Sequence, residues 1–423
     1  MGLNENDPEI FEAIENEKNR QSTTLELIPS ENFVSKGVLE ALGSVFNNKY
    51  AEGYPNKRYY GGNRYADVVE TLAINRAKQI FGVDHVNIQP YSGSPANQAV
   101  YFAVCEPGDK IMGMSLLFGG HLTHGWKVNF SAKFYNSVQY PTGEDGILDY
   151  DELEKLAKKE EPKIIFCGAT AYPRLYDYKR LGEIAHSYGG YFVADIAHEC
   201  GLIAAKTIPS PVGHADVITT TTHKTLRGPR AGMIMCNGNP SNPLKPCEKT
   251  RDNLPTLIDR AVFPGLQGGP HINTIAAIGV ALKEAMQPEF KEYAKQILKN
   301  AKVLASGLME NGFNLVTGGT DNHLMLIDLR NKNLGGKQAE TLLDEVGITA
   351  NKNTVPFDTK KPWDPSGIRM GTPVITTRGM KEDEMKCIAQ MISKVLDNPD
   401  DNQIKHKVKQ DVLELCRQFP FRC

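Results

Sequence analysis

The feature that most constrains the fold is an alternation of short apolar runs and helical patterns between about residues 80 and 236. Five apolar runs predict buried strands, at 86–90, 163–169, 191–197, 216–222 and 232–236. Near-continuous apolar strands joined by amphipathic segments are typical of a parallel sheet covered on both faces, so an α/β protein with a mostly parallel sheet is expected. In such sheets, ligands bind beyond the carboxyl ends of the strands. The polar residues that follow each strand are therefore the candidates for function.

The pattern changes on both sides of this region, which predicts three parts. Residues 1–35 are expected to form an N-terminal helical arm with a loop at 25–33, and residues 36–285 a large domain. A break before Pro288 ends the long apolar helix that precedes it. The helix and strand signals beyond the break predict a smaller α+β domain over 286–423.

Composition excludes several classes of protein. The chain has 423 residues, with Lys+Arg 48 and Asp+Glu 50, and the resulting net charge of −2 argues against a general nucleic-acid binder, which needs a basic field. No apolar run reaches the roughly 20 residues that a membrane span requires. The N-terminus is acidic and has no apolar core, unlike a transit or signal peptide, so a cytoplasmic location is expected.

The cysteines are scattered without a CxxC pair or even spacing, which argues against a zinc or disulfide framework. Free thiols in a reducing compartment are therefore predicted. The cysteines are Cys105, Cys167, Cys200, Cys236, Cys247, Cys387, Cys416 and Cys423.

Small polar residues follow the first of the strands, in the segment Ser92-Gly93-Ser94. Because they run into a helical pattern, their N–H groups and the helix dipole can face a phosphate. The alternative is an ordinary loop and helix cap. A P-loop is excluded, since GxxxxGK[ST] is missing.

A glycine pair, Gly119-Gly120, precedes His121 after another apolar run. Glycines allow a close backbone approach, and His121 offers a flat ring there. The alternative is a histidine satisfied in the core. A metal site on His121 and His124 would need a third ligand that the local sequence does not supply, so no metal is expected.

Two charged residues end apolar strands. Asp195 follows one of them, where a buried carboxylate needs a polar or cationic partner, although it could simply cap the next helix. Lys224 follows the next strand and is a candidate Schiff-base amine, with an ordinary solvated lysine as the alternative. A phosphate cradle, a flat ring, an acid and an amine together predict pyridoxal phosphate, because that cofactor needs each of these groups.

The chain resembles the serine hydroxymethyltransferases, which are pyridoxal-phosphate enzymes of fold type I. The segments that carry the resemblance are NKYAEGYPNKRYYGG (48–62), SGSPAN (92–97), GGHLTHG (119–125), DIAH (195–198), TTTTHKTLRGPR (219–230), FPGLQGGPH (263–271), TDNHL (320–324) and NKNTVPF (351–357). The resemblance implies a seven-stranded aspartate-aminotransferase-like sheet. It also implies reversible transfer of the hydroxymethyl carbon of serine to tetrahydrofolate, which yields glycine and 5,10-methylenetetrahydrofolate.

The resemblance also assigns roles to individual residues. Lys224 would hold the cofactor, Asp195 would pair with its ring nitrogen, and Thr221 would help to exchange the lysine for the substrate amine. The implied catalytic residues are Lys224, Glu52, Asp195, His121, Thr221 and Tyr50. The implied cofactor-binding residues are Ser92, Gly93, Ser94, His121, Thr170, Asp195, His198, His223, Lys224 and, from the other subunit of a homodimer or homotetramer, Gly269.

Substrate and folate contacts are implied in the same way. Arg369 would clamp the amino-acid carboxylate, because a planar fork of donors suits that task. The implied substrate-binding residues are Ser30, Tyr50, Glu52, Tyr60, His198 and Arg369. The implied folate-binding residues are Glu52, Tyr59, Tyr60, Leu116, Gly120, Leu122 and Asn353.

Some positions depart from the family pattern. Pro29 stands where alanine is usual, and Thr170 stands where serine is usual but keeps the hydroxyl. The polar segment 241–253 is predicted to be a surface loop. Two other functions remain open at this point: a threonine-aldolase-like lyase that needs no folate, and a catalytically silent homologue that binds RNA or a protein partner.

Overall fold

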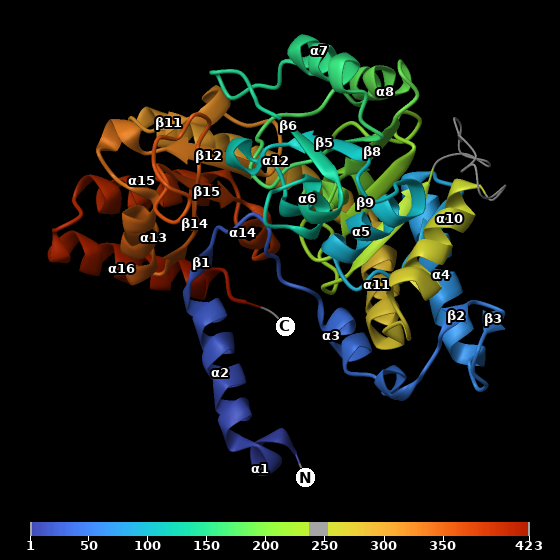
Figure 1. The fold of residues 1–423 in the computed structure, drawn as a ribbon. Helices are drawn as coiled ribbons and strands as arrows, with labels where there is room; N and C mark the ends of the chain where they lie inside the picture. Colours follow the sequence, from blue (N-terminus) through green and yellow to red (C-terminus); the bar gives the residue numbers. More distant parts are fainter. Residues whose placement is uncertain (1, 237–252, 422–423) are drawn as a thin grey trace. The chain divides into compact units, whose positions relative to one another are not determined.

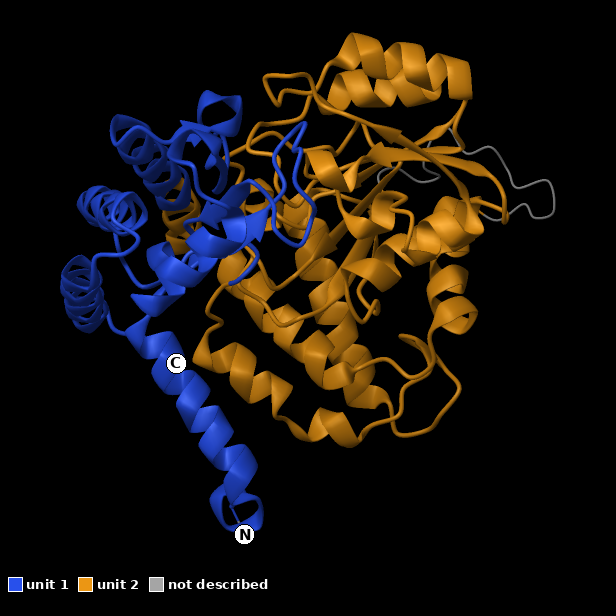
Figure 2. Ribbon diagram, turned by 60° about the vertical axis from the view of Figure 1, so that its left-hand side comes forward, with its two compact units in different colours: residues 1–31, 296–423 blue, residues 32–295 orange. Residues whose placement is uncertain are grey.

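The computed structural model describes residues 2–236 and 253–421. The chain separates into two compact units, residues 32–295 and residues 1–31 with 296–423 (Figure 2). Most of the segment 241–253, together with Cys247 and Cys423, lies outside the described residues.

The unit of residues 32–295 is built on a seven-stranded sheet in the order β4-β10-β9-β8-β7-β5-β6 (Figure 1). Its strands are β4 (His85–Asn87), β5 (Lys110–Met114), β6 (Asn136–Tyr140), β7 (Ile164–Cys167), β8 (Tyr191–Asp195), β9 (Val217–Thr221) and β10 (Gly232–Cys236). Five neighbouring strands pair in parallel, from β9 to β6, whereas β10 runs antiparallel to both β4 and β9. The prediction of a mostly parallel sheet is confirmed.

Helices cover both faces of this sheet. In Figure 1, α7 and α8 lie on one side of the strands, while α5 and α10 lie on the other. The sequence of α8 explains its place, because Leu181, Ile184 and Ala185 form a buried stripe and Asp177 caps its first turn by accepting from the Arg180 N–H. The longer helices of the unit are α3 (Lys36–Leu42), α4 (Arg64–Phe81), α5 (Gly93–Val104), α7 (Tyr150–Glu160), α8 (Tyr178–His186), α10 (Leu254–Arg260) and α11 (Ile272–Ala285).

The other unit combines both ends of the chain. Its sheet has the order β11-β12-β15-β14, with β11 (Asn314–Leu315), β12 (Leu324–Asp328), β15 (Gly367–Gly371) and β14 (Asn351–Asn353). Its longer helices are α2 (Pro8–Thr23), α12 (Pro288–Glu310), which begins in the first unit, α13 (Gly336–Glu345), α15 (Glu382–Asp397) and α16 (Asn402–Gln418).

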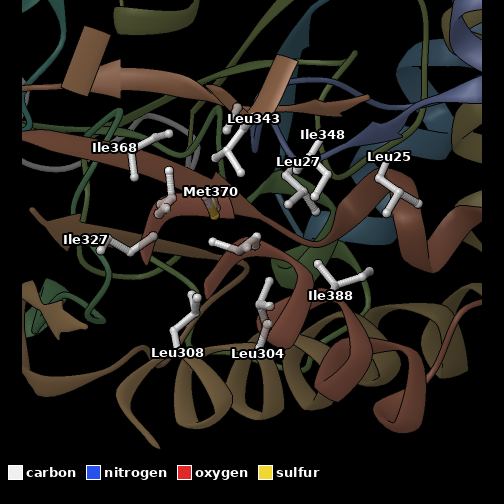
Figure 3. Packing of buried hydrophobic residues seen from close by; sticks show 14 of the residues in the cluster. Leu25, Leu27, Leu304, Leu308, Ile327, Leu343, Ile348, Ile368, Met370 and Ile388 are labelled. Atoms are coloured by element: carbon white, nitrogen blue, oxygen red, sulfur yellow. The ribbon is translucent and has the colours of Figure 1, made fainter. Parts of the chain in front are cut away.

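The prediction of a loop at 25–33 is wrong for its first two residues. Leu25 and Glu26 form strand β1, which pairs in parallel with β13 (Ile348–Thr349). Leu25 and Leu27 are fully buried in a core that also contains Leu304, Ile368 and Ile388 (Figure 3). Burial of these leucines stabilises the pairing, and the distant strand β13 that completes it could not be read from the local sequence.

Three further expectations concern the domain limits, the cysteines and the absence of a membrane span. The predicted domain limits, 1–35, 36–285 and 286–423, stay a prediction; the compact units have their limits at 31/32 and 295/296, inside α12. The six cysteines within residues 2–236 and 253–421 are all free, five of them buried and Cys387 exposed. Among residues 2–236 and 253–421, the structure has no helix of the length and apolarity that crossing a membrane would require.

Candidate functional site

A cavity lies at the carboxyl ends of the central parallel strands, where the topology predicts ligand binding. Residues from segments far apart in sequence form its wall. They are Gly93, His121, Ala169, Thr170, Asp195, Ala197, His198, Thr221 and Lys224. Seven of these were predicted site residues, so the fold brings together most of the predicted cofactor pocket.

Asp195 ends β8 and is held by three donors. Asn97 Nδ2 and His124 Nε2 lie 2.8 and 3.1 Å from its Oδ2 atom, and the Ala197 N–H donates to Oδ1 at 3.1 Å. Burial raises the pKa of this carboxyl, but the hydrogen bonds from His124 and Asn97 bring it below its ordinary value. Asp195 is therefore a buried carboxylate that stays ionised at neutral pH.

Sequence reasoning missed Asn97 and His124 as partners of Asp195. Asn97 is buried on α5, and its Nδ2 also donates to Thr123 Oγ1 at 2.8 Å. The His124 ring stacks on Phe166, with centroids 5.0 Å apart. Two features of the sequence could have pointed to these residues. Both lie inside segments that carry the family resemblance, and Asn97 lies one helical turn after Gly93, on the same face of the helix.

His121 presents a neutral ring to the cavity. Its Nδ1 atom lies 2.7 Å from Thr123 Oγ1 and accepts the Thr123 N–H at 3.2 Å, which fixes the orientation of the imidazole. Burial lowers the pKa of His121 to about 4. The ring is therefore uncharged near pH 7 and can lie against a flat aromatic ligand.

Lys224 follows β9 in a tightly held turn. The side chain of Asn32 donates to the Lys224 carbonyl at 2.9 Å, and the Gly228 N–H donates to the Thr222 carbonyl at 2.7 Å. Thr221, at the end of β9, also lines the cavity. The turn thus delivers the Lys224 side chain to the same cavity as Asp195.

His223 is placed differently from Lys224, the next residue in the chain. It is not part of the described cavity wall, and its Nδ1 atom is buried without a hydrogen-bond partner among residues 2–236 and 253–421. Burial lowers the pKa of His223 to about 3, helped by the nearby charges of Lys224 and Arg230. Its predicted contact with the cofactor stays a prediction.

The predicted phosphate cradle forms the N-terminus of α5. Ser92 is the cap residue, and its side chain makes no capping hydrogen bond, so the first N–H groups of the helix are available to an anion. A Cβ atom on Gly93 would lie only 2.7 Å from Thr221 Cγ2, so the close approach of α5 to β9 requires glycine. Ser94 is exposed beside them.

Gly119 and Gly120 allow the backbone to turn tightly below His121. Gly119 has φ +97°, and a Cβ atom on Gly120 would collide with the Met114 carbonyl. Thr170 Oγ1 donates to the carbonyl oxygens of both glycines, at 3.2 and 3.1 Å. Of the predicted folate contacts nearby, Leu122 is exposed and Leu116 is half-buried.

A second group of predicted residues is not part of the described cavity wall. Tyr50 packs edge-on against Tyr60 with ring centroids 5.0 Å apart, and Tyr59 packs against Phe263 at 5.6 Å. Tyr50 also lies against Gly269, and Glu52 against Gly268. We call Tyr50, Glu52, Tyr59, Tyr60, Gly268 and Gly269 the tyrosine patch. The described wall of the cavity contains none of its members.

A buried ion cluster holds the hairpin of β2 (Gly53–Tyr54) and β3 (Lys57–Arg58) that follows Glu52. The Arg58 side chain, only 4% exposed, lies 2.5 Å from Glu70 and 2.8 Å from Asp67. Its Nη1 also donates to the carbonyl oxygens of Ala51 and Gly53, on both sides of Glu52. The position of Glu52 is thus set by a buried arginine that sequence reasoning did not single out.

The remaining predicted residues belong to the unit of residues 1–31 and 296–423. Arg369 is buried on β15, and its Nε donates to Asn351 Oδ1 at 3.0 Å. Burial lowers the pKa of Arg369 to about 10, so the guanidinium keeps its charge at neutral pH. Asn353 lies on β14, where its Nδ2 donates to the Thr354 carbonyl, and Ser30 is half-buried next to Pro29.

The nitrogens of His121 and His124 and an oxygen of Asp195 lie within 4.8 Å of one another. Asp195 is thus a third potential metal ligand, which the sequence around the two histidines did not reveal. These groups already have partners, because His124 is hydrogen-bonded to Asp195 and His121 Nδ1 accepts from Thr123. The expectation of no metal stays a prediction.

The wall of the cavity fits pyridoxal phosphate in the chemistry of its groups. Asp195 is an ionised acid suited to a protonated ring nitrogen, Lys224 is an amine for the aldehyde, and His121 is an uncharged ring for the pyridine face. The N-terminus of α5, with the close-packed Gly93, offers N–H donors to the phosphate.

Comparisons with known proteins agree with this chemistry. A family model described as "Serine hydroxymethyltransferase" matches residues 3–392. The chain is 54% identical over 421 residues to a serine hydroxymethyltransferase of Koribacter versatilis (strain Ellin345), covering 99% of this chain and 96% of the relative. It is 53% identical over 418 residues to that of Desulfotalea psychrophila (strain LSv54 / DSM 12343), covering 99% and 95%.

Proposed function

The chain belongs to the serine hydroxymethyltransferase family, and we propose from that premise that the cavity around Asp195 and Lys224 is its catalytic site. The protein is a pyridoxal-phosphate-dependent transferase. It moves the hydroxymethyl carbon of serine to tetrahydrofolate, reversibly, giving glycine and 5,10-methylenetetrahydrofolate. The observation that carries the site assignment is that an acid, an amine and an uncharged ring from three separate segments line one cavity.

Pyridoxal phosphate, when bound, supplies an electron sink for the carbanion left at the amino-acid α-carbon. Asp195 would hold a proton on the pyridine nitrogen through its carboxylate, which Asn97 and His124 keep in place. Lys224 Nζ would hold the cofactor aldehyde and later give way to the substrate amine, with Thr221 assisting. Thr170 and His198 would orient the ring from the cavity wall.

The amino acid and the folate would be bound by residues outside the cofactor cradle. Arg369, with Ser30, would hold the substrate carboxylate through paired hydrogen bonds. Glu52 would exchange the proton of the serine hydroxyl. Folate would lie against Tyr59 and Tyr60, while backbone and amide groups of Leu116, Gly120, Leu122 and Asn353 would contact its pterin.

We further propose a homodimer with shared active sites, with a homotetramer as the alternative. The tyrosine patch is absent from the described cavity wall and yet strongly exposed, with Tyr50 54% and Tyr59 75% accessible. Helix α2 also exposes Ile10 and Ile14. Exposed apolar groups of this kind mark association surfaces. Each copy would thus lend its tyrosine patch, including Gly269, to the site of the other copy.

A cytoplasmic location is also proposed. It is supported by the six cysteines in the described part of the chain, which are all free, because a reducing compartment keeps such thiols from pairing.

The folate dependence of the site can be tested by one absorption spectrum. Adding glycine and then tetrahydrofolate to the holoenzyme is expected to produce an intense visible band that tetrahydrofolate strongly enhances. A band whose intensity does not change when tetrahydrofolate is added would favour an aldolase-like lyase. Purified protein that shows no cofactor absorbance, before or after incubation with pyridoxal phosphate, would favour a silent homologue.

Shared sites can be tested by mixing two defective copies. Lys224→Ala and Glu52→Gln homodimers would each carry a lesion in both sites. In a hybrid dimer, one site would carry both lesions and the other neither, so random mixing should restore about a quarter of wild-type activity. If Lys224 and Glu52 of the same copy served one site, every site would stay defective and mixing would restore no activity.

A further inference from the structure

Tyr91 lies directly before the phosphate cradle and is tied to the loop of the tyrosine patch. Its N–H donates to Gln267 Oε1 at 3.1 Å, and its hydroxyl donates to the Gly269 carbonyl at 2.9 Å. Its ring stacks on His271, with centroids 4.3 Å apart and planes 10° from parallel. Three separate contacts therefore join residue 91 to residues 267–271.

Gln267 completes this connection from the other side. Its Nε2 donates to the Gln89 carbonyl at 2.8 Å, so one amide side chain bonds both a carbonyl and an N–H of the segment 89–91. The same segment is bonded to the sheet, because the Gly232 N–H donates to the Pro90 carbonyl at 3.0 Å. A displacement of Gln267 would therefore be transmitted to the backbone that leads into Ser92 and Gly93.

The loop also contacts the acid–base candidate. A Cβ atom on Gly268 would lie 3.2 Å from Glu52 Oε1, and one on Gly269 would lie 3.2 Å from the Tyr50 ring. The contacts thus run in one series from the cradle through Tyr91 and Gly269 to Tyr50 and Glu52. All of these residues belong to the unit of residues 32–295.

We propose that Tyr91 and Gln267 are positioning residues that couple the phosphate cradle of one active site to the Tyr50–Glu52 segment serving the other site. The inference rests on the proposed function, since it requires each copy to lend its tyrosine patch to its partner. A pair of glycines has no side chains to fix its path, so the carbonyl of Gly269 and the N–H groups around it depend on external hydrogen bonds. The Tyr91 hydroxyl provides such a bond to the Gly269 carbonyl, and the Gln267 side-chain amide ties the residue before the glycines to the segment 89–91.

The first test measures cofactor binding to the apoenzyme. Tyr91→Phe keeps the stacked ring and removes one hydrogen bond, and Gln267→Leu removes two at similar volume. Each is expected to raise the dissociation constant for pyridoxal 5′-phosphate roughly three- to tenfold, and to affect pyridoxal, which lacks the phosphate, clearly less. The matched control is Tyr188→Phe, because the Tyr188 hydroxyl is buried without a partner among the described residues. Equal weakening of both ligands, or of neither, would contradict the role of Tyr91.

The second test uses hybrid dimers in which one copy carries Lys224→Ala, so that a single live site remains. That site combines Lys224 of the wild-type copy with the tyrosine patch of the disabled copy. Tyr91→Phe placed on the disabled copy is expected to lower kcat of the live site roughly three- to tenfold and to shift its pH profile.

The outcomes separate the two proposals. If Lys224→Ala and Glu52→Gln copies complement each other but Tyr91→Phe acts only within its own copy, the coupling is wrong while the shared site stands. If the Lys224→Ala and Glu52→Gln copies fail to complement each other, the proposal of a shared site is wrong, and the proposed coupling between subunits is wrong as well.

Discussion

Asp195→Asn is expected to lower kcat by about 10²- to 10³-fold at saturating cofactor, the cost of losing one preorganised charge in a buried site. Asparagine keeps the volume of the side chain but cannot balance a proton on the ring nitrogen. It would also turn an amide toward Asn97 and His124, which now donate to one carboxylate oxygen. Steady-state kinetics, with cofactor content checked by absorbance, would measure the loss.

The chain offers a closely matched control for this substitution. Asp216 is also a buried aspartate, and its Oδ2 atom is bonded to His186 Nε2 at 2.9 Å and to the Phe192 N–H at 2.8 Å. It is not part of the described cavity wall. Asp216→Asn should lower the melting temperature and leave kcat close to wild type. An equal fall in kcat for both variants would mean that Asp195 acts through stability alone.

Arg369→Ala is expected to raise the KM for serine by about two orders of magnitude or more, since it would leave the substrate carboxylate without its paired donors. The Arg369 Nε donates to Asn351 Oδ1 at 3.0 Å, which orients the plane of the guanidinium. Arg369→Lys keeps a positive charge but not the planar fork of donors, so its KM for serine should lie between the values for the wild type and Arg369→Ala. The affinity should also fall as pH rises through about 10, where Arg369 loses its proton.

A second arginine of the same unit serves as the control. Arg330 lies at the surface, with its side chain 48% exposed and paired with Asp328. Arg330→Ala removes the same charge from the same unit and should leave the KM for serine unchanged. If Arg369→Ala raised KM no more than Arg330→Ala, the assignment of Arg369 to the carboxylate would be refuted.

Much of the sheet was predictable because several of its strands, such as β7 and β10, are apolar throughout. A strand buried on both faces leaves a continuous hydrophobic run, as in 191–194, and the polar residue that ends the run marks the edge of the sheet. The same pattern singles out Asp195 and Lys224 from the sequence alone. The placement of β1 beside β13 was not predictable, because Leu25 and Leu27 find their partners more than 270 residues away, a distance that no local pattern encodes.

Charged residues were the hardest to interpret from the sequence. Arg58, Asp67 and Glu70 have the composition of a solvated surface, yet they form a buried ion cluster that holds the backbone beside Glu52. Burial of a charge depends on partners brought near by the fold, and the partners of Arg58 come from a separate helix. The Asn97 amide and the His124 imidazole that hold Asp195 likewise come from segments that only the fold brings near it.

The sequence by itself determined the fold class, the strand ends where the reactive groups lie, and the family. Each of these depends on local patterns or on motifs of contiguous residues. Only the tertiary structure decided that Asn97 and His124 keep Asp195 ionised, that His121 is neutral, and that Tyr91 connects the cradle to the loop beside Glu52. These properties arise from burial and from hydrogen bonds between segments distant in the chain, and such contacts exist only once the backbone has folded.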